Sequence, residues 1–163
     1  MSDETHLNLL EMNLALKIPP AVLTLIIAGA MWWIDENMNH SWIEFGPLYW
    51  AASISLALGG IFGVLGLVQF YQHSTSIDPH KPDKVSSLVT NGIYSVSRNP
   101  MYVALLLVLA AYGFYLGNGL TLALLPVFVG YMNRFQIEPE EKVMQEKFGE
   151  EFLHYKRDVR RWL

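Results

Sequence analysis

The sequence predicts an all-α integral membrane protein with four transmembrane helices, the last two forming a tight helical hairpin, and a C-terminal amphipathic cytoplasmic helix. Two observations predict this class. Of the 163 residues, 52% are hydrophobic and only 16% are charged, which is less charge than a soluble domain usually carries. The hydrophobic residues also gather in four stretches, 18–34, 48–71, 101–116 and 120–135. The length suits a single domain spanning residues 1–163.

The placement of the cations indicates how the four stretches cross the membrane. All eleven lysines and arginines occur at Lys17, within Lys81–Arg98, and from Arg134 onward. The connection between the first two stretches contains acids but neither lysine nor arginine. By the positive-inside rule, the loop 72–100 and both termini therefore lie in the cytoplasm. We expect a multi-pass protein of a bacterial inner membrane.

The first two stretches are both expected to be membrane helices. A cleaved signal peptide is the alternative for the first stretch, but three acids and only one cation, Lys17, precede it. A signal peptide needs a positively charged leading region, so we reject this alternative. In the second stretch Ser55, Gly59 and Gly63 recur every four residues. We expect this face to pack closely against another helix of the same chain.

The last two stretches have clear boundaries. Asn99 is a suitable N-cap residue and Pro100 suits the first helical position, so a helix is predicted to begin there. Its free N–H groups and positive dipole favour binding of a carboxylate. The sequence Gly-Asn-Gly at 117–119 is typical of a turn between two helices. Pro126 is expected to kink the fourth helix, which neighbouring helices can accommodate in a bilayer.

The C-terminal residues 138–163 predict an amphipathic helix, which Gly149 is expected to divide. Its apolar positions recur at spacings of three and four; they are Met144, Phe148, Phe152, Tyr155, Val159 and Trp162. One interpretation is an interfacial helix whose end, at Arg160 and Arg161, contacts anionic lipid headgroups.

Three acids at the start of this helix point to a binding site for a cation. Glu138, Glu140 and Glu141 follow the fourth stretch directly, beside Arg134. Acids also stabilise a helix start, so a structural role remains the alternative. The chain has no cysteine, which excludes disulfides and thiolate chemistry. Its net charge of −4 argues against a nucleic-acid partner.

Two motifs in the C-terminal half together resemble a group of membrane methyltransferases. They read LVTNGIYSVSRNPMY (Leu88–Tyr102) and EEKVMQEKFGEEFLHYKRDVRRW (Glu140–Trp162), and the two predicted hairpin helices separate them. This combination resembles the isoprenylcysteine carboxyl methyltransferase and phospholipid methyltransferase group. The resemblance implies an S-adenosyl-L-methionine cofactor, held in a cytoplasm-facing pocket that the C-terminal helix closes. The chain contains no Gly-x-Gly-x-x-Gly segment, which argues against a Rossmann-type methyltransferase.

Carried over residue by residue, the resemblance implies a set of cofactor-binding positions. They are Ser86, Ser87, Leu88, Val89, Tyr94, Asn99, Pro100, Met101, Tyr102 and Glu140. In this assignment the N-terminus of the third helix binds the carboxylate of the methionyl group. The carboxylate of Glu140 pairs with the amino nitrogen of the cofactor.

Two departures from the family pattern bear on the acceptor. Asn99 stands where the commonest pattern has histidine, and Gln136 replaces an arginine that holds the substrate carboxylate in enzymes that methylate prenylcysteine. We therefore do not transfer that activity. The candidate catalytic residues are Arg134, which would orient an anionic acceptor, and Glu141 or Tyr155, which would assist loss of a proton. A cation anchored at the membrane interface is an equal interpretation of Arg134.

The function expected from the sequence is methyl transfer from S-adenosylmethionine to a lipophilic or amphiphilic acceptor in the membrane. An isoprenylcysteine-like carboxylate, a lipid amine and a thiol all remain open, as does the oligomeric state. A non-catalytic membrane protein that retains the cofactor pocket is the main alternative. A transporter is disfavoured because the four stretches contain no acid or lysine. No metal site is expected, because His73, Asp78 and His80 lack a further convincing ligand.

Overall fold

The protein is all-helical in the part of the chain that the computed structural model describes, residues 18–38, 46–72 and 88–163. No β-strand occurs in these residues, so the predicted all-α class is confirmed for them. The elements are α2 (Pro20–Asn37), α3 (Tyr49–Gln72), the 3-10 helix η2 (Gly92–Ser95), α4 (Pro100–Leu116), α5 (Gly119–Leu122), α6 (Leu124–Tyr131), the π-helical segment η3 (Met132–Ile137), α7 (Glu138–Phe148) and α8 (Glu150–Asp158).

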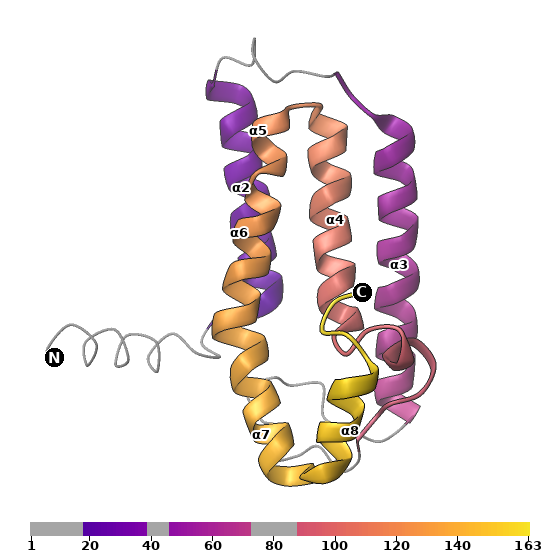
Figure 1. The fold of residues 1–163 in the computed structure, drawn as a ribbon. Coiled ribbons are helices and arrows are strands. Elements are labelled where there is room, and N and C mark those ends of the chain that lie inside the picture. Colours follow the sequence, from indigo (N-terminus) through magenta and orange to yellow (C-terminus); the bar gives the residue numbers. More distant parts are fainter. Residues whose placement is uncertain (1–17, 39–45, 73–87) are drawn as a thin grey trace, which may run out of the picture.

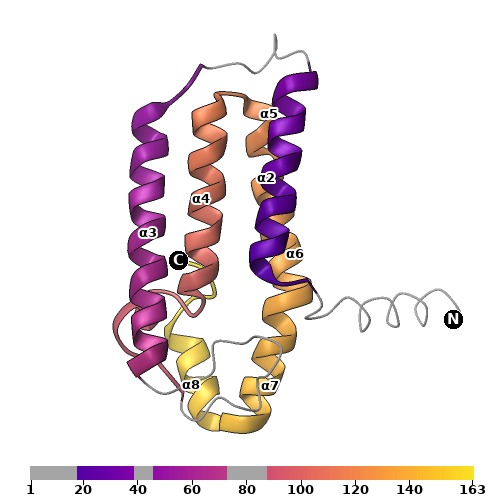
Figure 2. The same cartoon turned by 180° about the vertical axis from the view of Figure 1, so that it is seen from behind.

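Helix α4 lies at the centre of the bundle. It contacts α3 on one side and α2, α5 and α6 on the other (Figure 1). Viewed from behind, α2 runs alongside α5 and α6, at a distance from α3 (Figure 2). The larger buried cluster lies between α2, α4, α6 and η3; its members are Leu23, Ile27, Met31, Leu109, Phe128, Met132 and Ile137.

Within the described residues, two helical segments are long and apolar enough to cross a membrane. They are Tyr49–Gln72 and Gly119–Phe148, which includes α5, α6, η3 and α7, while Pro100–Leu116 is a shorter apolar helix. Much of α3 exposes large apolar side chains, and Trp50 near its start is 85% exposed. An apolar face of this size is unusual on a soluble protein and suits contact with lipid.

Small residues bring α3 close to α4, as the spacing of the glycines predicts. A Cβ atom built on Gly59 would lie 3.2 Å from the backbone oxygen of Ala104, and one on Gly63 would lie 3.5 Å from the Ala104 Cβ. A larger side chain at Gly59 would therefore force the two helices apart. The expected close packing of this face is confirmed.

The fourth apolar stretch is divided near its start. Helix α4 ends at Leu116, Gly117 adopts a left-handed conformation (φ 71°), and α5 begins two residues later. α5 ends at Leu122, and α6 begins after a turn at Ala123. The ring of Pro126 clashes with a helical carbonyl four residues earlier, which is that of Leu122. The predicted kink therefore takes the form of this break.

Two boundaries of the C-terminal region differ from the prediction. The helix expected to start afresh at residue 138 continues without interruption from α6 through η3 into α7. Gly149 (φ 52°, ψ −124°) divides α7 from α8, as expected. However, α8 ends at Asp158, and Val159 is extended. The prediction of helix up to residue 163 is thus wrong for the last five residues, whose backbone is held by contacts outside α8.

The apolar stripe of the C-terminal region packs inside the protein. Phe152 and Tyr155 of α8 are buried against Val89 and Tyr94. Trp162 packs instead against the larger cluster. An interfacial helix would expose this stripe to lipid, so the interfacial-helix interpretation of residues 138–163 is wrong for Phe152 and Tyr155.

Candidate functional site

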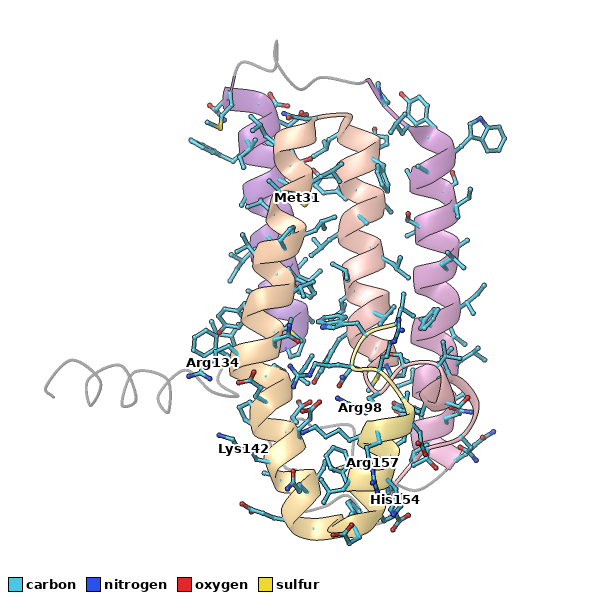
Figure 3. All side chains as sticks on the ribbon, viewed as in Figure 1. Met31, Arg98, Arg134, Lys142, His154 and Arg157 are labelled. Atoms are coloured by element: carbon cyan, nitrogen blue, oxygen red, sulfur yellow. The ribbon has the colours of Figure 1, made fainter. Side chains whose placement is uncertain are left out.

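Three segments meet at the end of the bundle where α4 begins. They are residues 88–102, the helix η3–α7, and α8 with the residues that follow it (Figure 1). These are the two motif regions identified in the sequence, together with η3. Arg98 points into the space between α7 and α8, whereas Arg134 and Lys142 point away from it (Figure 3).

A partly buried carboxylate, that of Glu140, lies at the centre of this region. Oε1 of Glu140 accepts a hydrogen bond from the hydroxyl of Tyr102 (2.7 Å) and another from Nε2 of Gln136 (2.5 Å). Gln136 is only 2% exposed, and its Nε2 also lies 3.4 Å from the Tyr102 hydroxyl. The two donors come from α4 and η3, so they join two elements around one oxygen.

Glu140 lies beyond the apolar part of its helix, which ends at Phe135. Burial raises the pKa of Glu140 to about 7, although the hydrogen bonds from Tyr102 and Gln136 act to lower it. The neighbouring charge of Glu141 raises the pKa further. Within the described ranges, no lysine or arginine forms an ion pair with Glu140. Its negative charge is therefore supported only by neutral donors.

Tyr94 presents an unpaired hydroxyl in the interior. The residue is 5% exposed, and its buried hydroxyl has no hydrogen-bond partner among the described residues. Its ring packs against Phe70 at a centroid distance of 5.6 Å, and its backbone oxygen accepts a hydrogen bond from Tyr155 (2.7 Å). Burial raises the pKa of both tyrosines well above the usual value, so their hydroxyls stay protonated. A buried hydroxyl without a partner is rare, so this group is open to a hydrogen bond from water or a ligand.

Glu141 is the centre of a second network. Arg98 donates to its Oε1 (2.7 Å), Arg161 donates to both oxygens (3.1 and 2.8 Å), and Nζ of Lys156 lies 3.4 Å from Oε2. Burial acts to raise the pKa of Glu141, but the hydrogen bonds and charges of Arg161 and Arg98 outweigh it and hold the pKa below its usual value. Glu141 is therefore ionised and fully engaged by cations.

The side chains of Arg98 and Asn99 hold residues 156–161 against the start of α4. The Arg98 guanidinium donates to the carbonyls of Lys156 (2.8 Å) and Val159 (2.9 Å). The Asn99 side chain donates to the carbonyl of Arg161 (2.9 Å) and makes no capping bond to α4. The predicted helix start at Pro100 is confirmed, but the side-chain cap by Asn99 is wrong because that amide serves the C-terminal segment.

The remaining predicted positions are distributed as follows. Leu88 and Val89 pack around Tyr94, and Pro100 is buried with Met101 next to it in the first turn of α4. Ser86 and Ser87 lie outside the described residues. The side chain of Arg134 is 53% exposed and pairs with Glu138 (3.2 Å), on the face away from Arg98 (Figure 3). The structure thus brings Tyr102 and Glu140 into direct contact, places Tyr94 in the apolar cluster with Phe152 and Tyr155, and leaves Arg134 at the edge.

Three residues of these networks received no role in the cofactor site from the sequence. Gln136 was noted only as a lost arginine, although its spacing of four from Glu140 places both on one helix face. Arg98 precedes the predicted helix start directly, and Arg161 was assigned to lipid headgroups. The signal for both arginines was the presence of adjacent acids at 140 and 141, which require cations if they are buried.

An open groove borders the second network and is lined by Glu141, Lys156 and Arg161 of that network together with Glu138, Lys142 and Gln145. Its lining combines acids with cations, and it includes neither Glu140 nor Tyr94. The groove is therefore a polar surface feature beside the Glu141 network, separate from the Glu140 site.

Comparison with known proteins identifies the family. The family model described as phospholipid methyltransferase matches residues 46–151, which include Tyr94, Tyr102 and Glu140. An uncharacterized protein from Haemophilus influenzae is 46% identical over 63 residues, which make up 39% of this chain and the whole of that protein. No solved structure matches the chain. Since the family match covers more than half of the sequence, this chain belongs to the phospholipid methyltransferase family of membrane methyltransferases.

Proposed function

We propose that this protein uses S-adenosylmethionine to methylate a lipophilic or amphiphilic acceptor in the membrane. The observation that carries the proposal is the carboxylate of Glu140, which is partly buried and, among the described residues, is bound by the neutral donors Tyr102 and Gln136 and by no cation. A buried charge needs a partner of opposite sign. The ammonium group of the cofactor would supply it.

The other residues of the site also fit this cofactor. In the first turn of α4 the N–H groups of Tyr102 and Val103 bind the carbonyl of Asn99. No side chain caps the helix, so the N–H of Met101 and the positive end of the helix dipole would bind the methionyl carboxylate. The buried, unpaired hydroxyl of Tyr94 is available to the adenosyl part. When bound, the cofactor supplies an electrophilic methyl group on a sulfonium.

The contribution of the protein is then alignment of donor and acceptor and exclusion of water. Orientation of this kind is worth up to roughly 7–11 kcal/mol in favourable cases. Glu141 and Tyr155 hold the site together in this proposal, since the carboxylate is engaged by cations and the hydroxyl by the Tyr94 carbonyl. Arg134, at the exposed edge, would orient an anionic headgroup.

The proposed topology places this site at the inner leaflet. The single domain, residues 1–163, would cross the membrane four times, with α4 and the helix after it as a hairpin and both termini in the cytoplasm. The exposed apolar side chains of α3 and the acidic and basic character of α7 and α8 support this orientation. The cofactor would enter from the cytoplasm and the acceptor from the bilayer.

Calorimetry on the purified full-length protein in detergent tests the proposal. We expect S-adenosylmethionine to bind, with an affinity that rises toward about pH 7 as Glu140 ionises. Glu140→Gln should weaken binding at least about tenfold, because a hydrogen-bonded charge pair is lost. Glu146→Gln, an exposed acid on the same helix, is the control and should bind as the wild type does.

A second experiment distinguishes an enzyme from a binding protein. The protein is incubated with radiolabelled S-adenosylmethionine and a fractionated membrane extract, and the labelled lipids are identified. Transfer of label that Glu140→Gln reduces would support the enzyme. Binding of the cofactor without transfer to any fraction would favour the non-catalytic alternative, and absence of binding would refute the cofactor assignment.

A further inference from the structure

The position of Gln136 is unusual for a polar side chain next to an apolar helix. It is almost fully buried, and its amide reaches both Glu140 and the Tyr102 hydroxyl. At the corresponding position in related enzymes an arginine has been linked to the acceptor. In this chain the side chain points instead at the carboxylate of Glu140. These contacts, and not contact with an acceptor, therefore indicate the role of Gln136 in this chain.

The hydrogen bonds around Glu140 are asymmetric. Both Tyr102 and Gln136 donate to Oε1, while no described residue donates to Oε2. Two donors from different elements, α4 and η3, fix the plane of the carboxylate. Oε2 is left as the oxygen with which a ligand can pair.

The backbone of η3 contributes to this arrangement. Gln136 belongs to the π-helical segment Met132–Ile137, and Glu140 lies in the first turn of α7, four residues later. π-helical turns occur frequently at functional sites because they redirect side chains within a continuous helix. Here the segment places a buried amide beside a buried acid.

We propose that Gln136 is a positioning residue of the cofactor site, which together with Tyr102 fixes Oε1 of Glu140 and presents Oε2 to a cationic group of the ligand. This inference rests on the proposed function. An amide suits the task because it orients the carboxylate without neutralising it. A lysine or arginine in its place would form an ion pair with Glu140 and compete with the cation of the ligand.

The charged neighbours of Glu140 are compatible with this role. From α4 only the neutral hydroxyl of Tyr102 reaches it, and on α7 the adjacent Glu141 repels its charge. Arg98 and Arg161 are bound to Glu141. Loss of the Gln136 donor should therefore raise the pKa of Glu140, since its hydrogen bond acts to lower that pKa.

The test is calorimetric titration of the full-length protein with S-adenosylmethionine across a series of pH values. Gln136→Met keeps the volume but removes the donor. We expect binding at least about tenfold weaker at neutral pH. In the profile of affinity against pH, the acidic limb, where affinity rises with pH as Glu140 ionises, should move to higher pH. Gln145→Met, an exposed glutamine on α7, is the control and should leave the profile unchanged.

A second variant makes the direction of the shift diagnostic. Gln136→Lys keeps a donor but adds a positive charge, so Glu140 should ionise at lower pH. The acidic limb should then move to lower pH, while the affinity falls through competition for the carboxylate. A general effect on folding would not shift the limb in opposite directions in the two variants.

The outcomes separate this inference from the proposed function. If the wild type binds the cofactor and Gln136→Met binds within about twofold with an unmoved acidic limb, the positioning role is overturned. If the limbs of both variants move in the same direction, it is overturned as well. If the wild type itself does not bind S-adenosylmethionine, the proposed function fails instead.

Discussion

Glu141→Gln is expected to destabilise the protein strongly. Glu141 is 8% exposed, and it is the shared partner of Arg98, Arg161 and Lys156. The side chain of Arg98 is itself only 8% exposed, so its guanidinium has no access to water as a substitute. Removing one partner of a buried ion pair costs about 3–5 kcal/mol, because the remaining charge stays buried without compensation.

The assay is thermal unfolding of the helical circular dichroism signal in detergent, at one scan rate. For a chain of this size each kcal/mol corresponds to about 2–4 °C, so the melting temperature should fall by about 6–20 °C. Glu138→Gln is the matched control, because the side chain of Glu138 is exposed on the same helix, where it pairs with Arg134 and, at 3.8 Å, with Arg161. Such surface pairs contribute about 0–1 kcal/mol.

The pH dependence gives an independent check on Glu141. A carboxyl whose folded pKa is held below the unfolded value of 4.5 contributes stability that is complete above that value. This contribution is lost as the pH falls through the folded pKa. The difference between wild type and Glu141→Gln should therefore be constant at neutral pH and shrink below about pH 4.5. Equal melting of both glutamine variants at neutral pH would refute a structural role for this network.

Three further predictions follow from the same structure. Burial raises the pKa of Glu140 from 4.5 to about 7. Without cofactor, the free energy of unfolding of the wild type should therefore fall by about 3 kcal/mol as the pH rises between these values. Chemical denaturation should show no such fall in Glu140→Gln. Gly59→Leu, which meets Ala104, should lower stability by about 1–3 kcal/mol, whereas Gly60→Leu, with nothing within 4 Å, should melt near the wild type. Arg134→Gln should bind S-adenosylmethionine with unchanged affinity in calorimetry, and a loss of affinity would place Arg134 inside the cofactor site.

Much of the fold could be predicted because local signals set the helix boundaries. Pro100 starts α4, Gly117 in the left-handed conformation ends it, and Gly149 separates α7 from α8. Each depends on the backbone preference of one residue, which sequence reveals directly. That η3 continues directly into α7 was not predicted. The change from apolar to acidic residues at 138 resembles the end of a helix, but here the helix continues and only its surroundings change.

The site was predictable in its residue types more than in its contacts. Tyr94, Tyr102 and Glu140 lie in the two motifs, and the family resemblance identified them. The Asn99 side chain binds a distant carbonyl instead of capping its own helix, and Arg98 binds Glu141. Both contacts depend on tertiary packing. No local pattern encodes which of several arginines reaches a buried acid.

The continuous helix from α6 through η3 to α7 has a mechanical consequence. Gln136 and Glu140 belong to this rod, whereas Tyr102 belongs to α4. A rod embedded in lipid changes its tilt when the thickness of the hydrocarbon layer changes, and residues beyond its apolar portion move with it. In the proposed topology, the chain length of the surrounding lipids would therefore change how Glu140 and Tyr102 meet, and the geometry of a polar site would depend on the thickness of the bilayer.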